Sequence, residues 1–293
     1  MPILLNGTEA AAHIKEELRQ QAIIWNKDKG MPFPHLAIVL VGNNPASETY
    51  IKNKMKACEK IGFITTLLRL EEEISEEELI QHIDFLNTNK EINGVIVQSP
   101  LPEHINAKRV VESISPMKDV DGFHPINIGR MALRLPAFKP ATPYGIDLLL
   151  RHYNIATQGK KCVIVGRSNI VGLPLSIMLG LNKEYANCTV TLCHSKTKDL
   201  IQHTQSADIL ITAMGQPKFI TEEMVKPKAI VIDVGITRIP SEDGDKPYIL
   251  CGDVDFEKVA SKCSYITPVP GGVGPMTIAA LLKNTMRAAK LQL

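Results

Sequence analysis

Short apolar segments with strand-like composition alternate with amphipathic segments along the whole chain. Segments of this kind stand at 35–42 (HLAIVLVG), 63–70 (FITTLLRL) and 94–100 (GVIVQSP), and the second half continues with CVIVG, CTVTLC, ADILITAMG, AIVIDVG and SYITPV. Apolar runs bounded by helical segments are typical of parallel strands that helices connect and cover. The alternation therefore predicts an α/β protein, and its second half predicts a Rossmann-like unit with a parallel sheet.

The chain of 293 residues has room for about two domains. We expect an N-terminal α/β catalytic domain at 1–140, completed by a C-terminal helix at 276–293, and a Rossmann-like domain at 141–275. In the first domain, Ile14, Leu18, Ala22 and Trp25 are spaced to share one face of an opening helix. A helix over 141–155 is expected to join the domains, with Thr142 suited to its N-cap and Pro143 to its first helical position.

Composition excludes several classes of protein. A formal net charge of +2 gives no strong field, so neither nucleic acid nor an anionic membrane is expected as a partner. No apolar run reaches the ~18 residues of a membrane helix, and the first residues do not resemble a targeting segment, so we expect a cytoplasmic protein. The six cysteines form no C-x-x-C pair, so no metal is expected.

The segment VIVGRSNIVG at 163–172 resembles the turn that holds a dinucleotide between a strand and a helix. Gly166 and Gly172 are retained, whereas Ser168 stands at the position of the middle glycine. Its side chain would crowd a pyrophosphate, so we expect the phosphates to lie farther out. A glycine turn that merely links strand to helix remains an alternative, because such motifs are weak alone.

The residues after the next strand favour NADP over NAD. NAD-binding turns place a carboxylate ~20 residues on, beside the ribose 2′-hydroxyl. Here the strand CTVTLC is followed by His194, Ser195 and Lys196, with no carboxylate before Asp199. A 2′-phosphate would be repelled by a carboxylate and bound by Arg167, Ser195 and Lys196.

Polar residues near the ends of first-domain strands are candidates for catalysis. Tyr50 and Lys54 share one face of a helix that follows the strand at 35–42, Gln98 ends a strand at 94–98, and Asp121 lies in the loop DVDGFHP together with Asp119. Each has a plainer interpretation as an exposed helix pair, a strand cap or a turn residue. The Tyr-x-x-x-Lys spacing of short-chain dehydrogenases does not apply, because there the pair follows the nucleotide turn.

Seven motifs in order resemble the bifunctional methylenetetrahydrofolate dehydrogenase/cyclohydrolase family: ETYIKNK, VQSPLPEHI, KDVDGFHPINIGR, ATPYG, VGRSNIVGLP, GDVDF and TPVPGGVGPMT. The resemblance implies that folate binds between a catalytic and an NADP-binding domain, usually in a homodimer that serves one-carbon metabolism and purine biosynthesis. It further implies that Lys54 is the principal catalytic residue, that Gln98 adjusts it, that Tyr50 stacks on the folate and that Asp121 holds the pterin.

Further binding residues follow from the same resemblance. Folate contacts are implied at Tyr50, Lys54, Val97, Gln98, Ser99, Asp121, Pro270, Gly271, Gly272, Val273 and Gly274. Cofactor contacts are implied at Gly166, Arg167, Ser168, Ser195 and Ile236.

The implied chemistry has two steps. Hydride passes from the methylene bridge of 5,10-methylenetetrahydrofolate to the nicotinamide, which requires mainly that the two rings be positioned. Water then attacks the methenyl carbon and the ring opens to 10-formyltetrahydrofolate. We expect Lys54 to be the general acid/base of this second step.

Two departures from the family bear on this interpretation. Ser99 follows Gln98 where the family usually has leucine, and Ala141 replaces a cysteine. Because Ser99 adjoins the partner of Lys54, a dehydrogenase without efficient cyclohydrolase activity remains an alternative. A second alternative is a non-catalytic NADP-binding sensor, which would leave the polar residues of the first domain unexplained.

Overall fold

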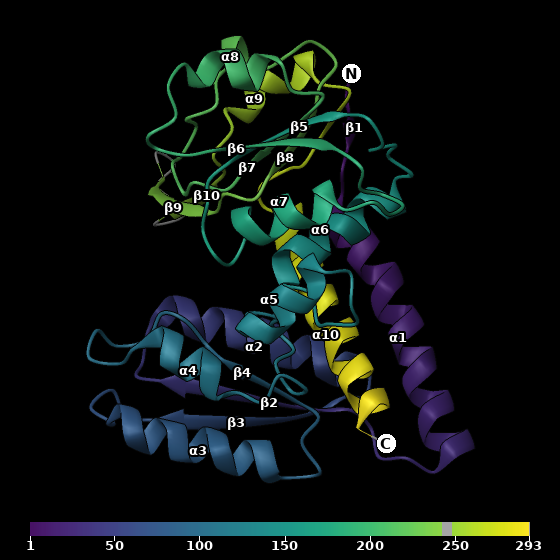
Figure 1. Cartoon of the computed structure of the whole chain (residues 1–293), viewed down its shortest axis with the longest axis vertical. Coiled ribbons are helices and arrows are strands. Elements are labelled where there is room, and N and C mark those ends of the chain that lie inside the picture. Colours follow the sequence, from purple (N-terminus) through teal and green to yellow (C-terminus); the bar gives the residue numbers. More distant parts are fainter. Residues whose placement is uncertain (242–247, 293) are drawn as a thin grey trace. The chain divides into compact units, whose positions relative to one another are not determined.

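The computed structural model describes residues 1–241 and 248–292 (Figure 1). The chain divides into two compact units. Unit 1 comprises Met1–Ala11 and Thr142–Thr277, and unit 2 comprises Ala12–Ala141 and Ile278–Leu293. Each unit contains a parallel sheet covered by helices, which confirms the predicted α/β class.

The sheet of unit 2 has three parallel strands in the order β3-β2-β4. Their bounds are β2 His35–Val41, β3 Ile64–Leu70 and β4 Gly94–Val97, which confirms the three strands predicted for the first half. The helices are α2 Pro45–Lys60, α3 Glu76–Thr88, α4 Ala107–Ser113 and α5 Pro125–Ala132, joined by most of α1 Gly7–Lys29 and of α10 Val273–Leu291. Figure 1 shows α3 on one side of the strands and α2 on the other.

Local sequence signals fix the ends of these helices. Asn44 caps α2, because its side-chain oxygen accepts hydrogen bonds from the N–H groups of Ala46 and Ser47. After α2 the chain turns at Gly62, whose φ of +80° suits glycine. Ser75 and Glu78 form a capping box at the start of α3.

Residues of the central strand β2 point alternately to the two faces of the sheet, and those on both faces belong to the core of unit 2. Ala37, Val39 and Val41 of β2 pack with a cluster from α3 and α4 that includes Leu79, Ile83, Leu86 and Val110. The intervening residues Leu36, Ile38 and Leu40 are also buried. Burial on both faces explains why the strand is a continuous apolar run. The predicted buried face of α1 is confirmed, since Ile14, Leu18, Ala22 and Trp25 are each no more than 8% exposed.

The sheet of unit 1 has six strands in the order β1-β11-β8-β7-β5-β6, all parallel. The five predicted strands are confirmed as β5 Lys161–Val165, β6 Thr189–Cys193, β7 Ile209–Thr212, β8 Ile230–Asp233 and β11 Tyr265–Ile266. The sixth, β1 Ile3–Leu4, was not predicted, because two residues are too few to show a period. It pairs with β11, so the first residues of the chain belong to unit 1.

Helices flank both faces of this sheet, with α8 Leu200–Gln205 and α9 Phe256–Val259 on one side and α7 Gly172–Gly180 on the other (Figure 1). Two short 3₁₀ helices belong to the same unit: Glu222–Met224 lies between β7 and β8, and Ala260–Lys262 directly follows α9. A separate antiparallel pair is formed by β9 Thr237–Pro240 and β10 Tyr248–Cys251.

The helix α6 spans Ala141–His152, so the predicted start was wrong by about two residues. Thr142 and Pro143 lie inside its first turn rather than at the N-cap and the first position. The N–H of Ala141 donates to the carbonyl of Asp121 at 3.1 Å, and this bond anchors the chain where the helix begins, two residues before the predicted first position. Pro143 is tolerated there because the first N–H groups of a helix lack intrahelical partners.

Candidate functional site

Lys54 and Gln98 meet in unit 2. Lys54 lies on α2, Gln98 directly follows β4, and the lysine Nζ donates a hydrogen bond to the glutamine Oε1 at 3.0 Å. Both side chains are half-buried. The structure therefore brings together the two residues that sequence reasoning paired.

Two neighbouring groups fix the orientation of the Gln98 amide. Its Nε2 donates to the carbonyl of Ser99 at 2.8 Å, so Oε1 is the atom left to accept from Lys54. The same carbonyl accepts from the hydroxyl of Ser47 at 3.3 Å. Ser99 thus acts through its backbone, and its own side chain is exposed.

Ser47 was missed at the sequence level. It is 1% exposed and precedes Lys54 by seven residues, which places both on one face of α2. The seven-residue spacing from Lys54 is visible in the sequence, but it does not show that the hydroxyl is buried or that it contacts the Ser99 carbonyl. Tyr50, also on α2, is 44% exposed, so its ring is free to receive a flat ligand.

The two aspartates of the loop DVDGFHP differ in their surroundings. The Asp119 carboxylate is 1% exposed and accepts hydrogen bonds from the N–H groups of Gly122 at 3.0 Å, Phe123 at 3.2 Å and His124 at 2.8 Å, and from the Asn127 amide at 2.9 Å. It therefore organises the loop. Burial raises its pKa, and these hydrogen bonds oppose that effect.

The Asp121 carboxylate receives no hydrogen bond from residues 1–241 or 248–292, while its backbone carbonyl holds Ala141. Burial raises the pKa of Asp121, and the positive charge of Lys54 acts in the opposite direction. Asp121 is thus within electrostatic reach of Lys54 and has unused acceptor capacity. A carboxylate in this state is suited to bind the N–H donors of a heterocycle.

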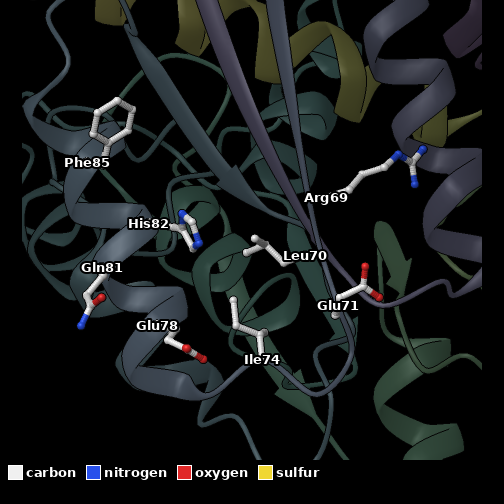
Figure 2. Close-up of a pocket in the computed structure, with 8 residues that line it drawn as sticks. All are labelled: Arg69, Leu70, Glu71, Ile74, Glu78, Gln81, His82 and Phe85. Atoms are coloured by element: carbon white, nitrogen blue, oxygen red, sulfur yellow. The ribbon is translucent and has the colours of Figure 1, made fainter.

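A pocket of about 680 Å³ lies elsewhere in unit 2, between the end of β3 and α3 (Figure 2). It contains none of the predicted site residues. Two of its charged groups already serve the local structure, since Arg69 pairs with Glu48 and Glu78 closes the capping box with Ser75. This pocket is therefore not the candidate site.

In unit 1, two glycines of the turn between β5 and α7 are required by close packing. Gly166 has a φ of +118°, and a Cβ there would lie 2.2 Å from the carbonyl oxygen of Ala213. A Cβ on Gly172 would lie 1.8 Å from the carbonyl oxygen of Gly166. The pattern G-x₅-G thus marks a turn that folds tightly on itself.

The N-terminus of α7 offers few free donors. The Val171 N–H donates to the hydroxyl of Ser168 at 3.2 Å, the Leu173 N–H donates to the Ser168 carbonyl at 3.1 Å, and Pro174 has no N–H. Ser168 therefore turns its hydroxyl toward the helix terminus. These bonds use backbone N–H groups that a phosphate could otherwise contact, and the position of the phosphates stays a prediction.

The candidate 2′-phosphate residues follow two paired strands. Val165 of β5 is in register with Cys193 of β6. Arg167 and Ser195 each stand two residues beyond that pair, and both are exposed. The ends of adjacent parallel strands thus present Arg167 and Ser195 at one edge of the sheet, with Lys196 next in the chain.

In the segment 270–274, Gly271 and Gly272 pack against the first residues of α1, which belong to the same unit. Gly271 has a φ of +104° and its carbonyl accepts from the Thr8 N–H at 3.0 Å. A Cβ on Gly7 would lie 1.7 Å from the carbonyl oxygen of Gly272. Gly272 and Val273 are buried, whereas Pro270 and Gly274 are exposed. Ile236, the last predicted cofactor contact, is 45% exposed.

The fold and the site are those of a two-domain α/β enzyme. One unit carries the hydrogen-bonded pair Lys54 and Gln98, and the other carries a dinucleotide-type turn on its own parallel sheet. Comparison with known families gives two matches. Residues 5–121 match "Tetrahydrofolate dehydrogenase/cyclohydrolase, catalytic domain", and residues 140–293 match "Tetrahydrofolate dehydrogenase/cyclohydrolase, NAD(P)-binding domain". The chain belongs to the tetrahydrofolate dehydrogenase/cyclohydrolase family.

Individual relatives are similar over their full length. The chain is 53% identical over 292 residues to "Bifunctional protein FolD" of Amoebophilus asiaticus, covering 100% of this chain and 98% of the relative. The crystal structure of the bifunctional FolD enzyme from Campylobacter jejuni is 48% identical, with a TM-score of 0.94 and 100% of each chain covered. The Trypanosoma brucei enzyme, solved with NADP and an inhibitor, is 34% identical with a TM-score of 0.93, covering 99% of this chain and 98% of that one.

These matches confirm the predicted family, the two-domain α/β fold class and the enzyme class. The NAD(P)-binding description agrees with the predicted cofactor, NADP. The roles of individual residues are not tested by these matches, and they stay predictions.

Proposed function

We propose that this protein oxidises 5,10-methylenetetrahydrofolate with NADP and hydrolyses the methenyl product to 10-formyltetrahydrofolate. The observation that carries the proposal is the hydrogen bond from Lys54 Nζ to Gln98 Oε1, with the Asp121 carboxylate electrostatically coupled to the same lysine. The family match and the full-length similarity to bifunctional FolD proteins support both activities.

In the proposed mechanism the chain contributes little covalent chemistry to hydride transfer. NADP supplies the hydride acceptor when it is bound, and the protein positions the folate. Tyr50 stacks on the folate ring system, and the Asp121 carboxylate accepts hydrogen bonds from the pterin. We also propose folate contacts at Val97, Gln98, Ser99 and Pro270 to Gly274.

Lys54 is the proposed general acid/base for the cyclohydrolase step. Proton transfers beside the former methylene bridge accompany water attack and ring opening, and a lysine amine placed next to that bridge can carry them. Gln98 offers an acceptor but no negative charge, so it orients the amine without locking it in an ion pair. The carbonyl of Ser99 and the hydroxyl of Ser47 hold Gln98 in that orientation.

NADP is the proposed cofactor in preference to NAD. Arg167, Ser195 and Lys196 supply a guanidinium, a hydroxyl and an ammonium group to a 2′-phosphate, and no carboxylate stands among them. Gly166, Ser168 and the backbone at Ile236 are the other proposed cofactor contacts.

The setting of the enzyme is also part of the proposal. We propose a cytoplasmic homodimer that acts on tetrahydrofolate derivatives in one-carbon metabolism and supplies purine biosynthesis, as the family resemblance implies. No helix within residues 1–241 and 248–292 is long and apolar enough to cross a membrane. Light scattering of the purified protein across a concentration series tests the dimer.

The decisive experiment compares Lys54→Met with Lys52→Met. Lys52 is an exposed lysine on the same helix, so its variant controls for the loss of a positive charge. Initial NADPH production and the decay of methenyltetrahydrofolate are followed separately. We expect Lys54→Met to lower the cyclohydrolase rate on the order of 10²-fold or more, with the control near wild type. An intact cyclohydrolase rate in Lys54→Met would contradict the assignment.

The alternative of a dehydrogenase without efficient cyclohydrolase activity rests on Ser99. The structure gives the carbonyl of this residue, and not its side chain, the contact with Gln98. We therefore expect Ser99→Leu to leave the ratio of the two activities within about threefold of wild type. A gain of cyclohydrolase activity well beyond that would favour the alternative for the natural chain.

A further inference from the structure

Two buried aspartates of unit 1 stand beside the proposed cofactor loops, and no step of the proposed mechanism uses them. Asp233 is the last residue of β8 and is 3% exposed, and Asp253 in the motif GDVDF is 0% exposed. A buried carboxylate costs folding energy unless it is fully hydrogen-bonded. Two buried carboxylates at this edge of the sheet therefore need hydrogen-bond partners that offset this cost, and those partners indicate their role.

The Asp253 carboxylate holds the loop after β7. Its Oδ2 accepts from the Met214 N–H at 2.6 Å, and its Oδ1 accepts from the Gln216 N–H at 2.8 Å. Two backbone donors of one short loop are therefore fixed by a single side chain that comes from ~40 residues farther along the chain.

The Asp233 carboxylate holds the loop after β8 and ties it to the segment that carries Asp253. Its Oδ1 accepts from the N–H groups of Gly235 at 2.9 Å and Asp253 at 3.0 Å, and from the Thr212 hydroxyl at 3.1 Å. Its Oδ2 accepts from the Val254 N–H at 2.9 Å. The four donors come from β7, from the loop after β8 and from the GDV segment.

Each of the two carboxylates lies close to a glycine near the other one: Asp233 to Gly252, and Asp253 to Gly235. A Cβ on Gly252 would lie 2.0 Å from Asp233 Oδ2, and a Cβ on Gly235 would lie 2.3 Å from Asp253 Oδ1. The motifs D-x-G at 233–235 and G-D at 252–253 are therefore complementary, because neither glycine could carry a side chain while both carboxylates keep their places.

The loop after β7, which Asp253 binds, also packs against the nucleotide turn at Gly166. The carbonyl oxygen of Ala213 lies so close to Gly166 that a Cβ there would be 2.2 Å away, and the Ala213 N–H donates to the Val165 carbonyl at 2.8 Å. Met214, which Asp253 binds, is the next residue. On the other side, the loop bound by Asp233 leads directly from Gly235 to Ile236.

We propose that Asp233 and Asp253 are positioning residues for the dehydrogenase reaction, which fix the loops at 213–216 and 234–236 and so hold the nicotinamide nucleotide against the turn at Gly166. The proposal rests on the proposed function for its choice of NADP. It assigns the pair no contact with the cofactor, since both act through backbone N–H groups.

Asp253→Asn is the test. An asparagine keeps one acceptor oxygen, so one of the two N–H groups in the loop after β7 loses its partner. We expect the KM for NADP to rise on the order of tenfold or more. Hydrolysis of methenyltetrahydrofolate needs no NADP, and its proposed residues Lys54, Gln98 and Asp121 are all in unit 2, so this rate should stay within about twofold of wild type.

Asp208→Asn is the matched control. Asp208 also accepts a backbone hydrogen bond, from the Lys161 N–H at 2.9 Å, and pairs with Lys226 at 2.5 Å. It precedes β7 and therefore lies at the opposite edge of the same sheet. We expect its variant to leave the KM for NADP unchanged.

Thr212→Val serves if Asp253→Asn does not fold. It removes only the hydroxyl that donates to Asp233 Oδ1, with little change in volume. A smaller rise in the KM for NADP, again without loss of cyclohydrolase rate, supports the proposal.

Three results would overturn it: an unchanged KM for NADP in both variants, an equal fall of both activities, or an equal rise of the KM in Asp208→Asn. The failure of the proposed function is distinguishable, because it would appear as wild-type protein without folate turnover. In that case the dissociation constant of NADP, measured by calorimetry on the same variants, still tests the positioning role.

Discussion

Asp119 and Asp121 stand two residues apart in one loop, and the structure predicts opposite consequences for replacing each by asparagine. Asp119 Oδ1 accepts from the N–H groups of Gly122 and Phe123, and Oδ2 accepts from the His124 N–H and the Asn127 amide. Asparagine keeps one acceptor oxygen, so two of these four donors lose their partner in either orientation of the amide.

The cost follows from that count. A buried donor without a partner costs roughly 1–3 kcal/mol, so two cost roughly 2–6 kcal/mol. Removing a buried negative charge offsets part of this, because burial disfavours the ionised carboxylate. We expect Asp119→Asn to lower the free energy of unfolding by roughly 2–4 kcal/mol.

Asp121→Asn should behave in the opposite way. Its carboxylate receives no hydrogen bond from the part of the chain that the structure describes, so the free energy of unfolding should change by less than about 1 kcal/mol. If this carboxylate holds the folate, the rate of both reactions at low folate concentration should fall on the order of 10²-fold.

The assay is urea unfolding followed by tryptophan fluorescence, combined with steady-state rates. Trp25 is the single tryptophan of the chain, is 4% exposed and lies in unit 2 with both aspartates, so its emission reports the unfolding of this unit. An Asp119→Asn protein as stable as wild type, or an Asp121→Asn protein less stable than Asp119→Asn, would refute this assignment of the two carboxylates.

Three further predictions concern unit 1. Arg167→Ala should raise the KM for NADP by ~10–100-fold and change that for NAD by less than about threefold, and an equal loss for both cofactors would count against a 2′-phosphate contact. Gly166→Ala should destabilise unit 1 by about 2 kcal/mol or more in thermal unfolding, because φ is +118° and the new Cβ would meet the Ala213 carbonyl; an unchanged melting temperature would mean that the turn relaxes freely. Burial raises the pKa of Asp233 to about 6, so the folded protein binds this proton more tightly than the unfolded chain, whose carboxyl titrates near ~3.9. The stability of wild type relative to Asp233→Asn should therefore fall by roughly 2 kcal/mol as the pH rises from 4 to 7 in urea unfolding, and a relative stability that rises with pH would be contrary to this sign.

Features that depend on neighbouring residues in the sequence were predicted well. The strands at 35–41, 161–165 and 209–212 are apolar runs because both of their faces are buried, and that property is visible in the residues themselves. The buried face of α1 follows from helical spacing. At the start of α6 the local signal predicted the wrong first residue. There the N–H of Ala141 donates to the carbonyl of Asp121, which lies in another segment, and the helix begins at Ala141.

The candidate site was predicted only in part. Family motifs indicated Lys54, Gln98 and Asp121, but their side-chain arrangement depends on strand β4 lying beside β2 and on α2 following β2. Ser47, which orients Gln98 through Ser99, was missed because a serine in a helix carries no signal of what its hydroxyl will meet. The turn at 166–172 was recognised from glycines that pack within it, which is a short-range requirement.

The sequence by itself determined the α/β class, most strands and the chemistry of the residues at their ends, because burial period and residue type are local properties. Only the tertiary structure decided which aspartate of DVDG supports the loop and which is left free, that β1 completes the sheet of unit 1, and that Asp233 and Asp253 interlock. Those outcomes depend on hydrogen bonds between segments many residues apart. Such bonds form only once strand order and register have brought their donors and acceptors within about 3 Å of each other.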